Sequence, residues 1–422
     1  MSGDDAHTVA TSTVASVLDQ RVVRTVFQPL VHLVDGEVVG FEVLSRGPEG
    51  STLEDPLVLF DAAEKVGRKE ELDWVFAASA FRAVREAHPH PSMTLFVNFK
   101  PTTLTGVCPD DLADEISRAR EHLRVVVEID EQDLRNDPAG VLDAAVRARS
   151  DGWGVALDNV GATPASLALL PVMHPDVVKL DLRVLADHQD EHSAEIETAV
   201  RAYAEVSGAV ILAQRVETSS DVLSARAFGA IYGQGWRYGH PGPLPSDSHT
   251  PRAPFPLLDA RENTDVPTPF EVIARHRSPI PTERRFLLRI SSVLERRALD
   301  SGAPTVLLAC IEHGRYFTSE TQARYVAFAS RASFTAVMGA DMPHVALADL
   351  HIVDLPPAEH LCREWNVLVV GPNYTGALVA RDLGETGEDD YRRYDHIVTH
   401  DRELVIDAAR SLLHWIGRGQ QD

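Results

Sequence analysis

The chain has 422 residues, of which 44% are hydrophobic and 24% are charged, as in an ordinary soluble globular protein. The length predicts two or more domains. The 40 basic and 63 acidic side chains leave a net charge of −23, which argues against DNA or RNA held by a broad basic surface. An anionic ligand held by a few arginines and metal ions stays compatible with this charge.

The three cysteines, Cys108, Cys310 and Cys362, lie far apart and form no CxxC pair. They predict neither a disulfide framework nor a zinc site, and they fit a reducing cytoplasm. Residues 1–13 are polar and acidic, unlike a signal peptide, and no apolar run approaches the ~18 residues that cross a membrane. We therefore expect a cytoplasmic protein without a membrane span.

The first half of the chain predicts short strands that alternate with helices. Residues 1–12 are expected to be disordered, and a helical pattern over 13–23 leads into two strands, Val26–Val31 and Val38–Leu44, joined by a turn at Asp35-Gly36. Helices are expected at 56–66 and 70–87, followed by five buried strands at 94–98, 124–129, 154–158, 177–181 and 210–214. Six or seven such units over ~230 residues predict an α/β fold with a closed (β/α)8-type barrel.

A proline-rich stretch at 241–256 has the composition of a linker. We therefore expect a barrel domain over 13–243, a linker over 244–268 and a second domain over 269–422. The second domain is expected to be an α/β unit with helices at 282–299, 318–332 and 401–416, and with strands at 305–311, 334–338, 344–350, 366–370 and 396–399.

Polar side chains end the predicted barrel strands and would meet at one mouth. Lys179 can orient a water or a phosphate, and Arg46 can clamp a phosphate. Taken singly, these residues have structural interpretations, such as a surface ion pair for Arg46, a loop cap for Asn98 and a stabilising pair for Asp181. As an ordered set they predict a site for Mg²⁺, Mn²⁺ or Ca²⁺ with hard oxygen ligands from Glu42, Asn98, Glu128 and Asp158.

Motifs spread through the first half resemble those of the EAL domain family, whose members bind and hydrolyse cyclic di-GMP. In chain order they are Phe27-Gln28-Pro29, Glu42-Val43-Leu44-Ser45-Arg46, Val97-Asn98-Phe99, Glu128-Ile129-Asp130-Glu131, Ala156-Leu157-Asp158-Asn159-Val160-Gly161, Val178-Lys179-Leu180-Asp181, Val216-Glu217-Thr218 and Gly233-Gln234-Gly235. The resemblance implies a barrel whose first strand is antiparallel. It also implies two Mg²⁺ or Mn²⁺ ions that activate a water to open one phosphodiester.

The resemblance also implies a role for each matching residue. The first metal would be held by Glu42, Asn98, Glu128 and Asp158. The catalytic residues would include Lys179, beside the attacking water, and Glu217, in the metal shell. The ligand would be contacted by Gln28, Arg46 and Gln234, and Glu131 would support the loop after Asp158.

Two acid-to-amide departures from the family pattern predict an impaired second-metal position, and a third adds a cation near the mouth. Asn159 replaces the second Asp of Asp-Asp-Phe-Gly, and Gln214 replaces the Glu of Ala-Glu-Gly-Val-Glu-Thr. A carboxamide neither takes up a proton as a carboxylate does nor carries its charge. Arg215 replaces a Gly, and its cation would either clamp a phosphate or block it. The alternatives are ligand binding without turnover, slow hydrolysis to the linear dinucleotide, and a purely structural or protein-interaction role.

Stretches in the second half resemble the DICT domain, a sensory module. They are Phe317-Thr318-Ser319-Glu320-Thr321, Val367-Leu368-Val369-Val370-Gly371-Pro372, Ala377-Leu378-Val379-Ala380-Arg381-Asp382-Leu383 and Thr399-His400-Asp401-Arg402-Glu403-Leu404-Val405. The resemblance leaves the ligand of this module open. Together the two halves predict a signalling protein, as a homodimer, whose barrel takes cyclic di-GMP or a protein partner.

Overall fold

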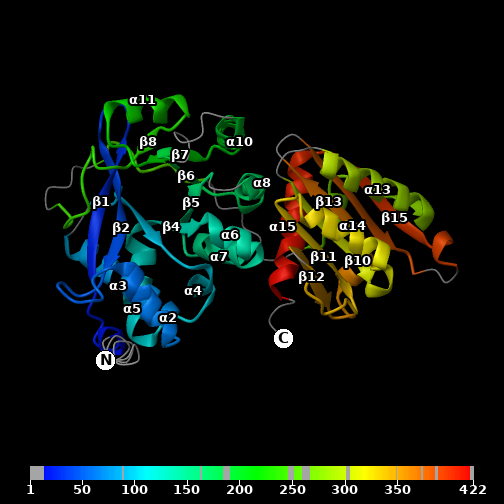
Figure 1. Cartoon of the computed structure of the whole chain (residues 1–422), viewed down its shortest axis with the longest axis horizontal. Helices are drawn as coiled ribbons and strands as arrows, with labels where there is room; N and C mark the ends of the chain where they lie inside the picture. The colour runs from blue at the N-terminus through cyan, green and yellow to red at the C-terminus, as the bar shows by residue number, and fades with distance from the viewer. Residues whose placement is uncertain are drawn as a thin grey trace, which may run out of the picture. The chain divides into compact units, whose positions relative to one another are not determined.

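The computed structural model describes residues 14–87, 90–161, 164–183, 191–245, 251–258, 267–300, 305–347, 349–371, 374–384 and 388–418. By its contacts the chain divides into two compact units, both visible in Figure 1. The first consists of Met1–Asp133, Asp143–Val160 and Pro175–Ala260, and the second of Leu134–Leu142, Gly161–His174 and Arg261–Asp422.

The first unit contains a closed barrel whose strands follow one another in chain order (Figure 1). They are β1 (Arg24–His32), β2 (Val38–Arg46), β3 (Thr94–Asn98), β4 (Arg124–Asp130), β5 (Gly154–Val160), β6 (Val177–Asp181), β7 (Val210–Gln214) and β8 (Tyr232–Gly233). β1 pairs antiparallel with both β2 and β8, and every other pair is parallel. The predicted α/β class, the barrel and its antiparallel first strand are confirmed.

Helices fill the connections between the barrel strands. They are α2 (Pro56–Lys65), α3 (Lys69–Ala87), α4 (Pro101–Thr105), α5 (Asp110–His122), α6 (Glu131–Asn136), α7 (Pro138–Ser150), α8 (Pro164–Met173), α10 (Glu191–Ser207) and α11 (Ser219–Ala227). Local sequence explains where several begin. Asp55 accepts the Leu57 N–H and precedes a proline at the first helical position of α2, whereas Thr218 and Asp221 form a reciprocal capping box at α11.

Residues 251–258, expected to belong to a linker, lie against the barrel instead. Phe255 is fully buried, and its ring lies 5.2 Å from that of Phe96 and 4.6 Å from that of Tyr232. Its carbonyl accepts a hydrogen bond from Arg124, the first residue of β4. This segment therefore covers the amino-terminal ends of the strands, opposite the expected site. Prolines favour an extended chain, but one buried aromatic ring is enough to anchor such a chain to a core.

The second unit contains a seven-stranded mixed sheet in the order β12-β11-β10-β13-β14-β15-β9 (Figure 1). Its strands are β9 (Ile280–Glu283), β10 (Val306–His313), β11 (Phe334–Ala340), β12 (Leu350–Leu355), β13 (Glu364–Val370), β14 (Thr375–Asp382) and β15 (Arg393–Thr399). β10 pairs parallel with β11 and antiparallel with β13. The helices are α12 (Pro269–Ala274), α13 (Arg284–Asp300), α14 (Ser319–Ala329) and α15 (Arg402–Arg418). Alternate residues of β10 and β13 form a hydrophobic cluster with α13 and α14.

The sheet differs from the predictions at three strands. Among the described residues, 344–347 form no strand; β12 starts only at Leu350, and Val345 is half exposed. The preceding loop folds back onto the strand instead, where the Met342 N–H donates to Asp354. β14 was not among the strands expected from the apolar pattern, although its residues 377–382 belong to a stretch that resembles the DICT domain. β9 was also not expected, and it overlaps the start of the helix predicted over 282–299.

Candidate functional site

Three carboxylates surround one buried ammonium at the carboxyl ends of the barrel strands. Nζ of Lys179 lies 3.4 Å from Oδ1 of Asp158 and 3.7 Å from Oε2 of Glu42, and it donates a hydrogen bond to Oε1 of Glu128. Lys179 is fully buried, and the three acidic residues are at most partly accessible. These four residues meet because β2, β4, β5 and β6 all run in one direction and end at the same mouth.

The cluster holds more negative charge than its own cation balances. Three carboxylates and one ammonium have a formal charge of 1 − 3 = −2. Burial and the neighbouring carboxylate of Glu42 raise the pKa of Glu128 well above its usual value, and burial raises the pKa of Asp158. Burial alone would lower the pKa of Lys179, but the three carboxylates outweigh it and raise that pKa. A divalent cation would complete the charge balance.

Three side-chain amides direct N–H groups at these carboxylates. Asn98 donates to Oε2 of Glu128 at 2.9 Å. Gln214 donates to Oδ1 of Asp158 at 2.7 Å, and Asn159 donates to Oδ2 of Asp158 at 3.1 Å. Both oxygens of Asp158 therefore accept a hydrogen bond from a side-chain amide.

An irregularity in β5 brings Asp158 and Asn159 to the same place. Adjacent residues of a regular strand point to opposite faces of the sheet. The pairing of β5 with β6 shifts register between Leu157 and Val160, and Asn159 has a left-handed backbone with φ of +58°. Asn tolerates this conformation better than most residues. The bulge thus turns both side chains toward the mouth.

Gln28 and Gln234 extend the cluster around Glu42. Gln28 of β1 is the antiparallel partner of Glu42 in β2. Gln234, just after β8, donates to Gln28 at 2.8 Å and also donates to Glu42. Arg46 at the end of β2 is half-buried and donates to the carbonyl of Ser45 at 2.7 Å, which uses one of its five N–H groups.

The described contacts of two predicted site residues, Arg215 and Glu217, lie outside the cluster. Arg215, with a left-handed φ of +60°, places Nε 2.6 Å from Asp181, which is the stabilising pair considered above for that carboxylate. Glu217 is exposed, and its described hydrogen bond is a backbone N–H donated to Asp221 in the cap of α11. Glu131 is buried at the start of α6. Thus the structure does not bring the Glu217 side chain into the carboxylate cluster.

One residue of the site had no role in the sequence analysis. Oδ2 of Asp130 accepts a hydrogen bond from Asn159 at 3.0 Å, and its Oδ1 accepts the Gln132 N–H at 2.7 Å. Asp130 follows Glu128 by two residues, so the alternation of side chains along a strand places both on one face. That spacing was the signal available in the sequence.

The three carboxylates of the cluster are groups that could hold a hard cation. Glu42, Glu128 and Asp158 supply carboxylate oxygens and surplus negative charge, which suit Mg²⁺, Mn²⁺ or Ca²⁺. Within the described ranges, no three His, Cys, Asp or Glu side chains already stand in a metal-binding arrangement. Asn98, the fourth predicted ligand, directs an N–H at Glu128, and Asn159 directs N–H groups at Asp130 and Asp158, so neither amide turns its oxygen toward these carboxylates.

Comparisons with known proteins place both halves in described families. The EAL domain model matches residues 13–241, which is more than half of the chain, and the DICT model matches residues 271–383. DICT is described as a sensory domain in diguanylate cyclases and two-component systems. No helix in the described part of the chain has the length and apolar character needed to cross a membrane.

Two curated relatives match about half of the chain. The probable cyclic di-GMP phosphodiesterase PdeB of Escherichia coli (strain K12) is 27% identical over 226 residues, which are 52% of this chain and 43% of that protein. The cyclic di-GMP phosphodiesterase NbdA of Pseudomonas aeruginosa is 28% identical over 228 residues, 52% of this chain and 29% of that protein. The chain therefore spans less than half the length of these two relatives.

Solved structures show similar matches. The EAL domain of Xanthomonas citri FimX in complex with c-diGMP has a TM-score of 0.48 and 18% identity, and the match covers 57% of this chain and 96% of that one. Klebsiella pneumoniae BlrP1 with manganese and cy-diGMP has a TM-score of 0.45 and 24% identity, with 52% and 56% covered.

Proposed function

Because the chain belongs to the EAL domain family, we propose that its barrel binds cyclic di-GMP with little or no turnover and is coupled to the DICT domain as a signalling device. The relatives PdeB and NbdA are named as cyclic di-GMP phosphodiesterases, and DICT is a sensory domain. These names support cyclic di-GMP as the ligand. The extent of turnover depends instead on the residues at the mouth of the barrel.

The observation that carries the proposal is the pair of amides on Asp158. Asn159 and Gln214 donate to its two oxygens, so neutral N–H groups occupy the surroundings in which a second cation would need oxygen ligands. When two ions are bound, they stabilise the attacking and leaving oxygens of a phosphodiester together. This chain has the residues for one of those ions. We therefore expect that the ligand is retained intact.

Binding can survive because the groups that face an anionic ligand are present. A hard cation held by Glu42, Glu128 and Asp158 would offset the surplus negative charge of the mouth. The Arg46 guanidinium suits a phosphate, and Gln28 supplies a polar amide opposite Glu42. Lys179, fully buried among three carboxylates, is a positioning residue that holds those carboxylates in place.

The experiment is a calorimetric titration of cyclic di-GMP into the full chain, with Mg²⁺ or Ca²⁺, followed by chromatography of the mixture. We expect binding and recovery of the intact dinucleotide. Arg46→Gln should weaken binding about tenfold or more, since it removes a charged hydrogen-bond partner. Arg201→Gln is the matched control, because Arg201 is half exposed on α10 and pairs with Glu197. No heat and no product would overturn the proposal and leave a protein-interaction role.

The alternative is a slow Mg²⁺- or Mn²⁺-dependent phosphodiesterase that gives the linear dinucleotide. It is favoured by the retained set of Glu42, Glu128, Asp158 and Lys179. Repeated turnover that is lost in Glu42→Ala would establish it. Under our proposal, restoring both acids with Asn159→Asp and Gln214→Glu should instead raise Mn²⁺-dependent turnover by about a hundredfold or more, since a bound ion contributes several kcal/mol to a transition state.

We further propose that the chain works in the cytoplasm as a homodimer and signals to a protein partner. Its three cysteines are free, which suits a reducing compartment, and its net charge of −23 suits proteins better than DNA as partners. Light scattering on the full chain, with and without cyclic di-GMP, should give twice the chain mass. A monomer under both conditions would contradict the dimer.

A further inference from the structure

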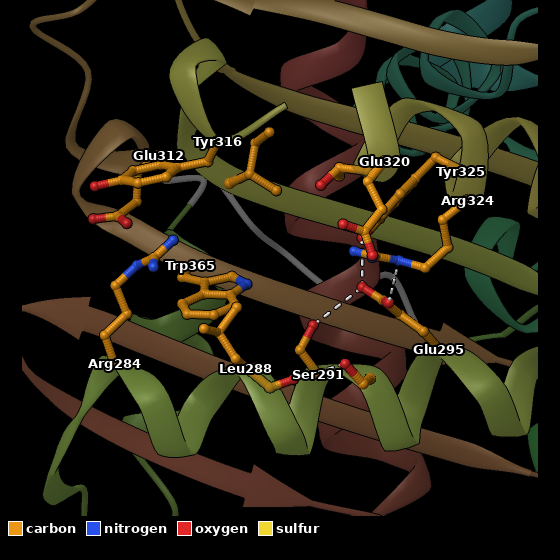
Figure 2. Close-up of a pocket in the computed structure, with 13 residues that line it drawn as sticks. Arg284, Leu288, Ser291, Glu295, Glu312, Tyr316, Glu320, Arg324, Tyr325 and Trp365 are labelled. Atoms are coloured by element: carbon orange, nitrogen blue, oxygen red, sulfur yellow. Dashed lines mark hydrogen bonds and ion pairs between the residues drawn. The ribbon is translucent and has the colours of Figure 1, made fainter. Parts of the chain in front are cut away.

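The second unit contains a cavity that the proposed function does not use. It has a volume of about 260 Å³ and is lined by α13, α14 and the ends of β10 and β13 (Figure 2). The α13 lining residues recur at helical spacing and so share one helix face, along about three turns: Arg284, Leu288, Ser291, Ser292 and Glu295. The cavity is therefore elongated along this helix.

One end of the cavity combines a guanidinium with two aromatic rings. The guanidinium carbon of Arg284 lies 4.3 Å from the ring centre of Tyr316 and 5.3 Å from that of Trp365. Nε of Arg284 is buried and has no hydrogen-bond partner among the described residues. The nearby lining carboxylate of Glu312 is bound by Arg392 at 3.3 Å and by the Tyr394 hydroxyl at 2.9 Å. Arg284 thus has unused capacity for an anion.

The other end offers a buried acceptor. The Glu295 side chain is 3% exposed, and its Oε1 accepts hydrogen bonds from Ser291 at 3.1 Å and from the Tyr325 hydroxyl at 3.0 Å. Oε2 lies 3.0 Å from Nε of Arg324 in an ion pair, and as a carboxylate oxygen it has a second lone pair. Figure 2 shows this carboxylate between Ser291 and Arg324. Oε2 can therefore accept a hydrogen bond from a bound molecule.

The middle of the cavity is apolar, with Leu288, Ile311 and Trp365 on its walls. The wall at the end of β10 is held in an uncommon conformation, since Glu312 has a left-handed φ of +64° where the pairing with β11 shifts register. Such backbone strain persists only where the surrounding structure imposes it. The cavity volume lies just below the usual range for small-molecule sites, so a molecule with one aromatic ring fits better than a nucleotide.

We propose that this cavity binds a small, elongated aromatic carboxylate with a hydroxyl or amino group at the end opposite the carboxylate. The carboxylate pairs with Arg284, the ring lies against Leu288 and Trp365, and the distal group donates to Oε2 of Glu295. This assignment is independent of what the barrel binds. It gives the sensory domain a site and a class of ligand.

The test is calorimetry of the full chain with three probes that differ in one group each. They are 3-(4-hydroxyphenyl)propionate, 3-phenylpropionate, which lacks the hydroxyl, and 3-(4-hydroxyphenyl)propanamide, which lacks the charge. We expect the first to bind and each of the others to bind about ten- to a hundredfold more weakly. Failure of the first probe to bind at low millimolar concentration would overturn the proposal.

Variants separate this site from a general change in stability. In Arg284→Gln the preference for the acid over the amide should vanish, whereas Arg289→Gln, exposed on the same helix and outside the cavity lining, should keep it. In Glu295→Gln the hydroxyl should no longer strengthen binding, and 3-phenylpropionate should bind as it does to the unaltered chain. Preferences unchanged in both cavity variants would contradict the assignment. Titration with cyclic di-GMP should be unaffected, which distinguishes this test from that of the barrel.

Discussion

Glu128 in the barrel and Glu364 in the second unit are both almost fully buried, but their neighbours differ. Glu364 in β13 accepts hydrogen bonds from donors only: the Thr268 hydroxyl, the Phe270 N–H, the Asn366 amide and the Arg381 guanidinium. Glu128 accepts from Lys179 and Asn98, but two further carboxylates share the same ammonium.

The comparison shows how a structural carboxylate differs from a site prepared for a ligand. Burial raises the pKa of both Glu128 and Glu364, so burial and pKa alone do not distinguish them. At Glu364 the donors satisfy the carboxylate and tie the start of α12 to β13. At Glu128 negative charge stays unbalanced, and unbalanced buried charge is costly unless something else binds there.

The largest effect should come from Lys179→Met. Removal of the ammonium leaves three carboxylates facing one another, and we expect a loss of about 3–5 kcal/mol in the free energy of unfolding at neutral pH. Millimolar Mg²⁺ should restore part of this loss. Lower pH should also restore part of this loss. A carboxylate with a raised folded-state pKa favours the folded state when it is protonated, and this contribution is lost as pH rises through that pKa. Urea unfolding at pH 5 and pH 7.5, with and without Mg²⁺, measures both. If the loss in the free energy of unfolding were the same with and without Mg²⁺ and at both pH values, the distinction between Glu128 and Glu364 would be wrong.

A smaller loss, about 3 kcal/mol, is expected for Glu364→Ala, since it leaves buried donors on Thr268 and Asn366 without an acceptor. Here Mg²⁺ should change nothing, because no surplus charge is present. Glu271→Ala serves as control: this residue also pairs with Arg381, at 3.0 Å, but is 44% exposed, so about 1 kcal/mol or less is expected. Rescue of Glu364→Ala by Mg²⁺ would contradict our interpretation of this network.

Asp73→Asn tests burial without neighbouring carboxylates, and its effect should be the smallest. Burial raises the pKa of Asp73 to about 6, and the side chain accepts from Thr103 at 2.8 Å. Its protonated form favours the folded state, so this contribution is complete below about pH 4 and is lost as pH rises through about 6. Relative to the unaltered chain, the free energy of unfolding of the Asn variant should rise by about 1–2 kcal/mol between pH 4 and pH 7.

Asp61→Asn provides the matched control for this measurement, because Asp61 is 62% exposed on α2. Its difference from the unaltered chain should be nearly the same at pH 4 and pH 7. An equal pH dependence in both variants would mean that burial of Asp73 does not set its pKa.

The sequence was sufficient for the barrel and for the meeting of Glu42, Glu128, Asp158 and Lys179. Alternation of strands and helices implies parallel strands, and parallel strands place their last residues at one edge. The direction of the amides was not predictable. The hydrogen bonds of Asn159 depend on a local register shift between β5 and β6, which has no pattern in the residues themselves.

Other features escaped prediction because they depend on residues far apart in the chain. Phe255 lies in a proline-rich stretch, and only the barrel floor gives its ring a partner. The cavity draws on Arg284, Tyr316 and Trp365, which belong to separate elements and meet only through the order of the sheet. The periodicity of the sequence predicts each helix and strand, but it does not predict which of them will line the same cavity.

The burial of Lys179 gives the protein a built-in reporter of its own opening. The sequence contains four lysines, and the side chains of Lys65, Lys69 and Lys100 are 44%, 30% and 43% exposed, whereas that of Lys179 is 0% exposed. An amine-reactive label will therefore modify three lysines at once and the fourth only when the barrel opens locally. The labelling rate of Lys179 therefore measures how often the mouth of the barrel opens. A cation or nucleotide bound at the mouth will lower this rate.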